Sequence, residues 1–275
     1  MLKKSLYFDF KVAIMHELRL RTRIIFLLQK YVALVAVIAK RPASISVGTS
    51  RVAVESISDI GGLQSCIVDV HDEIVSAKLL GANPSILDVG ANIGQWTTSV
   101  KLFYPGATIL SIEPDPEIFK KLQRNVTSLT DVETLCCAVG SEAGTAILFR
   151  QKLSGMSTLF PGKNDSRANP VDVPIRTIDE LASGRKIDFV KIDVEGAELE
   201  VILGAEQTLT HARLLLVELN LGRSSINGIT TLSEIQRMFP NSKIIKFGRP
   251  LGDLDKPDCQ DAVIAISHDE PSRDF

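Results

Sequence analysis

The sequence has few features of a specialised class of protein. Only 5% of its 275 residues are aromatic, whereas 45% are hydrophobic and 23% are charged. It contains no internal repeat and no low-complexity tract. An apolar share of this size can form a core, so the composition excludes collagen-like and intrinsically disordered chains, which lack the surface that offsets the entropy of ordering.

Cysteine is scarce, and its spacing argues against a zinc site. The four cysteines form no Cys-x-x-Cys pair and no Cys/His pattern typical of structural zinc. Cys136 and Cys137 are adjacent in a strand-like run, so their side chains should point to opposite faces. We expect reduced cysteines in a cytoplasmic protein, with none of them catalytic.

The charges are unevenly distributed along the chain. Residues 1–41 hold nine Lys and Arg against two acidic residues, a net charge of +7, whereas the remaining residues hold 22 basic against 31 acidic, a net charge of −9. An acidic main body argues against a nucleic-acid groove, because neutralising phosphates requires a clustered basic face.

The basic segment 1–41 has neither the uninterrupted apolar region of a signal peptide nor the roughly 20 apolar residues that span a bilayer. Its longest apolar stretch, 24–39, is broken by Gln29 and Lys30. The pattern predicts an amphipathic helical segment docked on its own domain, with peripheral contact to an anionic membrane or packing on a partner as alternatives. Short β-type runs then predict a small β-element over 42–69.

From residue 70 to 275, apolar strands alternate with helical stretches, which indicates an α/β domain built on an open sheet. An additional edge strand near 146–150 and a loop at 163–170 are expected before the fourth strand. The seven main strands are predicted at 85–89, 108–112, 132–139, 187–192, 214–219, 243–247 and 262–267.

A glycine turn follows the first of these strands. Residues 86–94 read Ile-Leu-Asp-Val-Gly-Ala-Asn-Ile-Gly and lead into a helix. Gly90 and Gly94 would let the backbone approach a ligand at the carboxyl end of a parallel strand, where open α/β sheets bind cofactors. The spacing is GxxxG rather than GxGxxG, so a dinucleotide fits less well, and an ordinary strand-to-helix turn is the alternative.

An acidic residue, Glu113, ends the second strand, 23 residues beyond Gly90. A carboxylate at this position can accept both hydroxyl protons of a ribose, although an exposed strand-end acid without a ligand would fit the pattern too. Asp115 is better suited to cap the next helix, because Pro116 fits the first helical position.

Two later strands also end in acidic residues. Asp193, Glu195 and Glu198 occur in Lys-Ile-Asp-Val-Glu-Gly-Ala-Glu, and Glu218 and Asn220 end the following strand. Asp193, Glu218 and Asn220 could face one another across neighbouring strand ends, where their oxygens would suit Mg²⁺ or hold a substrate hydroxyl. Glu195 and Glu198 could instead stabilise a helix N-terminus, and a purely structural role for the acids stays open.

In combination, these motifs resemble those of the FkbM family of S-adenosylmethionine-dependent methyltransferases. The resemblance covers about residues 70–220 and includes Cys137-Ala-Val-Gly and Gly155-Met-Ser-Thr-Leu, a loop expected near the acceptor. It implies a class I methyltransferase (Rossmann-like) fold, with seven mostly parallel strands, the last antiparallel, and helices on both faces. It further implies methyl transfer from S-adenosylmethionine to a hydroxyl of a sugar, glycolipid or polyketide-like acceptor. Cofactor-binding residues by this resemblance are Asp88, Gly90, Asn92, Gly94 and Glu113, with adenine near Cys137, Ala138 and Val139.

The donor's chemistry limits what the protein must supply. A sulfonium already activates its methyl carbon, so the protein mainly aligns the reactants and excludes water. Asp193 is the first candidate for the group that takes or orients the acceptor's proton, followed by Glu195 and Glu218. His71 is a further candidate, although a lone histidine is more often structural. No residue is assigned to a resident metal, and Mg²⁺ is an additional candidate ligand.

Other functions share parts of this pattern. An NAD(P)-dependent oxidoreductase or epimerase has the glycine turn and the second-strand acid, but the sequence lacks GxGxxG and a Tyr-x-x-x-Lys pair. A nucleic-acid methyltransferase would be expected to carry an Asn/Asp-Pro-Pro-aromatic turn where Asp-Val-Glu-Gly occurs. A non-catalytic, membrane-associated nucleoside-binding protein would keep the fold without turnover. We expect a small-molecule or glycan acceptor, no nucleic-acid partner, and either a monomer or a homo-oligomer.

Overall fold

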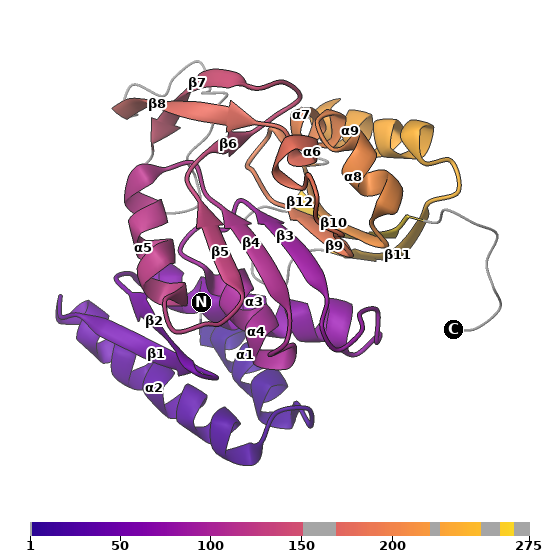
Figure 1. Ribbon diagram of the computed structural model, residues 1–275. Helices are drawn as coiled ribbons and strands as arrows, with labels where there is room; N and C mark the ends of the chain where they lie inside the picture. The colour runs from indigo at the N-terminus through magenta and orange to yellow at the C-terminus, as the bar shows by residue number, and fades with distance from the viewer. Residues whose placement is uncertain (1, 151–168, 221–225, 249–258, 267–275) are drawn as a thin grey trace.

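The computed structural model describes residues 2–150, 169–220, 226–248 and 259–266 (Figure 1). The 155–159 loop and most of the 163–170 loop, both singled out from the sequence, lie outside these ranges.

A seven-stranded sheet forms the centre of the molecule, in the order β11-β12-β10-β9-β3-β4-β5. Neighbouring strands from β10 to β5 are parallel, whereas β12 runs antiparallel to both β10 and β11. The predicted seven-stranded, mostly parallel sheet with an antiparallel last strand is therefore confirmed. Its strands are β3 (Ser85–Val89), β4 (Thr108–Ile112), β5 (Val132–Leu135), β9 (Phe189–Ile192), β10 (Leu214–Asn220), β11 (Lys243–Gly248) and β12 (Cys259–Ala265).

The strand predicted at 132–139 is in fact two strands in different sheets. Its second half, β6 (Ala138–Val139), pairs with β8 (Asn169–Arg176), which also pairs with β7 (Gly144–Arg150). Figure 1 shows this three-stranded sheet beyond the carboxyl ends of β4 and β5. The predicted edge strand near 146–150 thus belongs to the small sheet, and Asn169 and Pro170 of the predicted loop begin β8.

Helices cover both faces of the central sheet, because apolar side chains along each strand point alternately to one face and to the other. Ile86 packs with the helices α3 and α4, whereas Leu87 and Val89 pack in the core on the opposite face, because successive strand side chains point to opposite sides. The predicted cap is confirmed, since the Asp115 side chain accepts hydrogen bonds from the first-turn amides of α5. The helices of this part are α3 (Ile57–Val70), the π-helical turn η1 (His71–Val75), α4 (Gln95–Phe103), α5 (Pro116–Val126), α6 (Ile178–Leu181), α7 (Glu198–Leu203), α8 (Glu206–His211) and α9 (Ile226–Met238).

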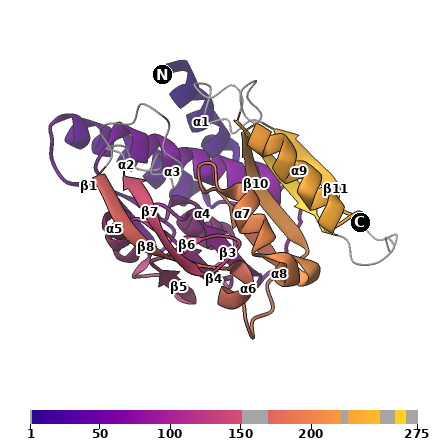
Figure 2. The same ribbon diagram turned by 90° about the horizontal axis from the view of Figure 1, so that it is seen from above.

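The N-terminal layer consists of α1 (Leu2–Ile14), α2 (Leu20–Ile38) and a hairpin of β1 (Ala43–Val47) and β2 (Ser50–Val54). It shares one hydrophobic core with α3, and Figure 2 shows the three helices along one side of the molecule. The segment 42–69 therefore contains most of a helix as well as a β-hairpin. Among the helices that the structure describes, none has the length and hydropathy needed to cross a bilayer.

Candidate active site

A cavity of about 140 Å³ opens at the carboxyl ends of β3, β4 and β9. The strand order reverses at this point, because the chain builds β4 and β5 on one side of β3 and β9 and β10 on the other. Loops that leave neighbouring strands in opposite directions create a crevice, which is where open α/β sheets hold their ligands. The predicted residues that line it are Gly90, Asn92, Glu113, Cys137, Ala138, Val139, Asp193 and Glu195.

The turn after β3 requires glycine at Gly90. Its φ is +79°, and a Cβ there would lie 1.8 Å from the carbonyl oxygen of Asp193. Gly90 thus allows the loops after β3 and β9 to approach each other. Gly94 has a different role, because a Cβ at this position would meet Leu122 and Val126 of α5, and Gly94 does not line the cavity. The position thus allows a close contact between the start of α4 and α5.

Glu113 is a buried carboxylate in the cavity wall. Its Oε2 accepts a hydrogen bond from the amide of Asn92 and its Oε1 from the amide of Asp115, each at 2.9 Å. Burial raises the pKa of Glu113 to about 7, against the two amide hydrogen bonds, which lower it. The group is therefore held rigidly and changes its charge near neutral pH.

Beneath the cavity floor lies a buried lysine that sequence reasoning did not select. The Nζ atom of Lys191 donates to the Gly90 carbonyl at 3.0 Å and lies 3.3 Å from carboxylate oxygens of both Asp88 and Asp193. Burial would lower the pKa of Lys191, but the Asp193 and Asp88 carboxylates outweigh it and raise the pKa well above its usual range. A charged residue inside the apolar strand Phe-Val-Lys-Ile, next to Asp193, was the available signal.

Asp88 acts below the cavity rather than in it. The side chain is fully buried and accepts a 2.6 Å hydrogen bond from the Thr97 hydroxyl, besides its ion pair with Lys191. It is not among the lining residues. Asp88 thus helps to hold Lys191, whose Nζ atom donates to the Gly90 carbonyl in the glycine turn.

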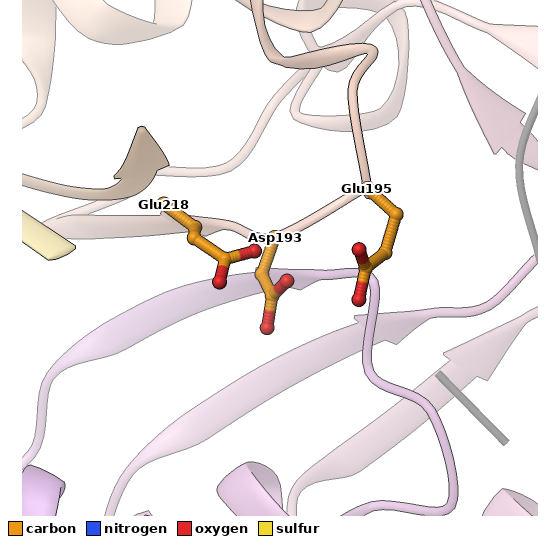
Figure 3. Close-up of side chains that lie close together, drawn as sticks. All are labelled: Asp193, Glu195 and Glu218. Atoms are coloured by element: carbon orange, nitrogen blue, oxygen red, sulfur yellow. The ribbon is translucent and has the colours of Figure 1, made fainter. Parts of the chain in front are cut away.

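Three carboxylates converge at the edge of the cavity (Figure 3). Oxygens of Asp193, Glu195 and Glu218 all lie within 4.8 Å of one another. The predicted meeting of Asp193 with Glu218 is observed, and Glu195, whose φ is +54°, lies close to both of them. This arrangement could accept a proton from a hydroxyl, and its oxygens are the kind that a hard cation prefers.

Glu198 does not join this cluster, because it serves the helix that it begins. Its carboxylate is buried and accepts a 2.9 Å hydrogen bond from the amide of Gly196 at the start of α7. Burial raises the pKa of Glu198 despite this hydrogen bond. The role at a helix N-terminus that the sequence left open for Glu198 is the one observed.

The opposite wall of the cavity is apolar, as expected for a surface that meets a planar base. Cys137, Ala138 and Val139 contribute to it, together with Ile118 of α5 and Leu148 of β7. Burial raises the pKa of the Cys137 thiol to about 11, so the thiol stays neutral and unreactive at physiological pH. Ile118 and Leu148 were not predicted, since they reach the wall from separate elements.

His71, which the sequence offers as a further catalytic candidate, is not among the residues that line this cavity. One ring nitrogen lies 2.9 Å from Glu17 and the other 2.9 Å from Asp72, while the ring packs near Phe103. Phe103 ends α4, whose first residue follows the cavity turn, so these contacts lie at the amino ends of the strands. The histidine connects the N-terminal layer to the sheet domain.

Comparison with known proteins finds a methyltransferase family and several methyltransferase relatives. Residues 88–241 match the family model described as "Methyltransferase FkbM domain". Methyltransferase sdnD of Sordaria araneosa is 36% identical over 162 residues, 46% of this chain and 62% of that protein. Methyltransferase 1 of Beauveria bassiana is 30% identical over 165 residues, 50% of this chain and 66% of that protein. The matched region thus spans less than two thirds of either of these relatives.

A third relative and one solved structure extend the comparison. The 2-O-methyltransferase NoeI of Sinorhizobium fredii is 25% identical over 193 residues, 64% of this chain and 79% of that protein. Aeropyrum pernix fibrillarin, solved with bound S-adenosyl-L-methionine, aligns with a TM-score of 0.46 and 10% identity over 74% of each chain.

Proposed function

Because the chain belongs to the FkbM methyltransferase family, we propose that it transfers a methyl group from S-adenosylmethionine to a hydroxyl of a sugar-type small molecule. The observation that carries this proposal is the placement of Asp193 beside the cavity that contains Glu113. A group that can receive a hydroxyl proton then lies next to a group that can hold a ribose.

The residues of the cavity fit S-adenosylmethionine, which supplies a methyl group on a positively charged sulfur. Glu113 lines the cavity and, when ionised, would accept hydrogen bonds from the two ribose hydroxyls. Ala138, Val139 and Ile118 form an apolar wall for the adenine. Gly90 leaves room beside the loop after β9, and the nearby carboxylates favour a cation.

Asp193 is proposed to receive the acceptor's proton. As the new oxygen–carbon bond forms and the sulfur–carbon bond breaks, the acceptor hydroxyl loses its proton to the Asp193 carboxylate. Lys191 holds this carboxylate in position through the ion pair at 3.3 Å. Glu195 and Glu218, on either side, are placed to hold the acceptor by accepting hydrogen bonds from its other hydroxyls.

A polyhydroxylated acceptor suits this arrangement, because three adjacent carboxylates can accept from several hydroxyls. Support also comes from two relatives, whose names describe a 2-O-methyltransferase and a hexuronic acid methyltransferase, the latter from Haloferax volcanii. Glycolipids and polyketide-like alcohols complete the acceptor panel. We place the reaction in the cytoplasm, where the donor is made available to cellular enzymes.

The first test is calorimetric titration of the full chain with S-adenosylhomocysteine, with NADH as the comparison. We expect binding of S-adenosylhomocysteine that is lost in Glu113→Ala and kept in Glu117→Gln, a matched control at an exposed acid of α5. Binding of NADH alone would replace the proposal by a dehydrogenase or epimerase, and binding of neither would favour a non-catalytic role.

Methyl transfer is then measured with a labelled donor over the acceptor panel. Asp193→Asn should lower turnover by about 100-fold while S-adenosylhomocysteine binding persists, since loss of a general base typically costs that much. Unchanged turnover in this variant would remove Asp193 from the mechanism. The same carboxylates would also suit Mg²⁺, so activity is compared with EDTA and with added Mg²⁺; loss of activity with EDTA would assign them to a cation instead.

A further inference from the structure

We propose that the outward faces of α1 and α2 bind the surface of an anionic lipid bilayer, with both helices lying along the membrane plane. This contact is separate from methyl transfer and does not depend on it. The outer face, as we name this surface, comprises Leu6, Phe10 and Ile14 of α1 and Ile24, Leu28 and Val35 of α2.

The outer face is apolar where a surface helix is normally polar. The opposite sides of α1 and α2, which include Phe8 and Phe26, are buried in the hydrophobic core that these helices share with α3. On the outward side, Leu28 is 64% and Val35 68% exposed. Within each helix, the residues of the outer face are spaced four or seven apart, which places them on one side of the helix. Several large apolar side chains exposed on one side of a helix mark a candidate interaction site.

The charges around the outer face fit an anionic partner. Exposed Arg19 and Arg21 lie at the start of α2, and exposed Lys40 and Arg41 follow its end. Throughout the described ranges, these four cations have no ion-pair partner. Positive charges at both ends of an apolar stripe are typical of helices that lie in the headgroup region of acidic membranes.

The acidic residues of this segment are used within the protein. Asp9 accepts hydrogen bonds from Lys30 and from the Gln64 amide, and Glu17 pairs with His71. They therefore offset little of the positive charge that surrounds the outer face. The rest of the protein carries a net charge of −9, so an acidic membrane would repel it and attract this side.

A bilayer fits this surface better than a second copy of the chain. In a two-fold contact, the same patch meets itself, so the flanking arginines and lysines of two copies would be brought together and would repel each other. The buried Lys30 and the 2.6 Å hydrogen bond that the Ser46 amide donates to Gln29 fix the inner side of α2 to the protein. The helix would accordingly lie on the membrane rather than enter it.

The docking geometry leaves the cavity open to water. Helix α5 begins beside the cavity and ends at the N-terminal layer, where the Asn125 carbonyl accepts a hydrogen bond from the hydroxyl of Ser50 at the start of β2. The layer and the cavity thus lie toward opposite ends of the central strands (Figure 1). Membrane-bound and free protein are therefore expected to bind S-adenosylhomocysteine equally.

The test is co-sedimentation of the full chain with vesicles of phosphatidylcholine, alone or mixed with phosphatidylglycerol. Wild type should sediment with the mixed vesicles. Leu28→Asp/Val35→Asp should bind them at least about tenfold more weakly, since two negative charges replace apolar side chains that would enter the membrane surface. Ile229→Asp, at a position on α9 that is 62% exposed, is the matched control and should bind like wild type. High salt should weaken binding, because it screens the arginines and lysines.

The proposal is overturned if wild type ignores the mixed vesicles, or if the double variant binds them as well as wild type does. It is also overturned if light scattering shows a dimer that Leu28→Asp/Val35→Asp converts to a monomer, because a second copy would then cover the outer face. Circular dichroism checks folding, and Leu28→Ser/Val35→Ser repeats the test without added charge. Binding of S-adenosylhomocysteine by each variant reports on the cavity separately.

Discussion

The protein contains a lysine buried beside aspartate in the N-terminal layer and another in the candidate active site, and the two differ in what their partners can do. Lys30 pairs with Asp9, whose side chain is 15% exposed and also accepts from Gln64. Lys191 pairs with Asp88 and with Asp193, whose side chain is 42% exposed at the cavity. The first arrangement is enclosed in the protein, whereas the second fixes an acid that still faces a ligand.

A buried ion pair therefore does not by itself mark a ligand-binding site. Burying the charges is costly in both places, and the pairing compensates for the cost. The difference lies in the outer partner, because Asp9 directs its oxygens to Lys30, Tyr31 and Gln64, which tie α1 to α2 and α3. Asp193 instead directs its carboxylate toward Glu195 and Glu218 at the cavity edge.

The largest effect is expected from removing the cation of the active-site pair. Lys191→Met should lower the free energy of unfolding by about 3–5 kcal/mol, because it leaves Asp88 charged, buried and without its cation. Urea denaturation measures this loss. Lys191→Arg keeps the charge and should recover part of the stability, and a loss under about 1 kcal/mol in Lys191→Met would show that the pair is not needed.

A smaller loss is expected in the N-terminal layer. Asp9→Asn should lower the free energy of unfolding by about 1–3 kcal/mol, since Lys30 stays buried without an anion but still donates to the Ser5 hydroxyl. Urea denaturation again provides the measurement. Binding of S-adenosylhomocysteine should be unchanged in this variant, and a loss of binding would contradict the separation of the two regions.

The pH dependence of ligand binding should separate the regions further. The pKa of Glu113 is about 7, so binding of S-adenosylhomocysteine should be about tenfold stronger at pH 8 than at pH 6, because only the ionised carboxylate accepts both hydroxyl protons. Glu113→Gln should remove this dependence in calorimetric titrations. Burial acts against ionisation of Asp9, but hydrogen bonds from Lys30, Tyr31 and Gln64 lower the pKa of Asp9 overall, so it stays charged over this range.

The ligand-free protein offers a check on the sign of the Glu113 shift. The native pKa of Glu113 lies above the ordinary value of 4.5, so the folded state holds the proton more tightly. Its contribution to stability should therefore decrease as pH rises from about 4.5 to about 7, and Glu113→Gln should lose this component. A Glu113 contribution that increased with pH over this window would contradict the raised pKa.

The smallest effect is expected from an exposed ion pair that also joins the two regions. Glu55 pairs with Lys121 at 2.7 Å and with Arg124 at 3.3 Å, linking the end of β2 to α5. Glu55→Gln should lower the free energy of unfolding by less than about 1 kcal/mol, because solvent and salt screen such pairs. A loss comparable to that of Lys191→Met would show that the loss in the free energy of unfolding depends on charge pairing rather than on burial.

Much of the fold was accessible from the sequence. The strands at 85–89 and 108–112 were predicted with the observed bounds, because each is a short apolar run between turn residues. The family resemblance is confirmed by the match over residues 88–241. The division of 132–139 was missed, since a run of strand-forming residues does not reveal that its two halves join different sheets.

Part of the candidate active site could also be predicted from the sequence. Asp193 and Glu113 were selected because the carboxyl ends of parallel strands meet at one edge of a sheet. His71 was selected because it precedes the first strand, but α3 runs alongside α4 and carries the histidine to the other end of the sheet. The three-part division of the chain and the catalytic roles of the carboxylates stay predictions.

The sequence by itself determined where the backbone turns and which strands end in acidic residues. The alternation of side chains along a strand, glycines and helix-capping residues all act over only a few residues of the chain. The tertiary structure alone decided what each side chain meets. Lys191 became the support of Asp193 because Asp88 and the Gly90 carbonyl surround it, and Gly94 became a packing position because α5 lies against it. Such partners come from distant segments, and only the packed chain brings their charges and surfaces together.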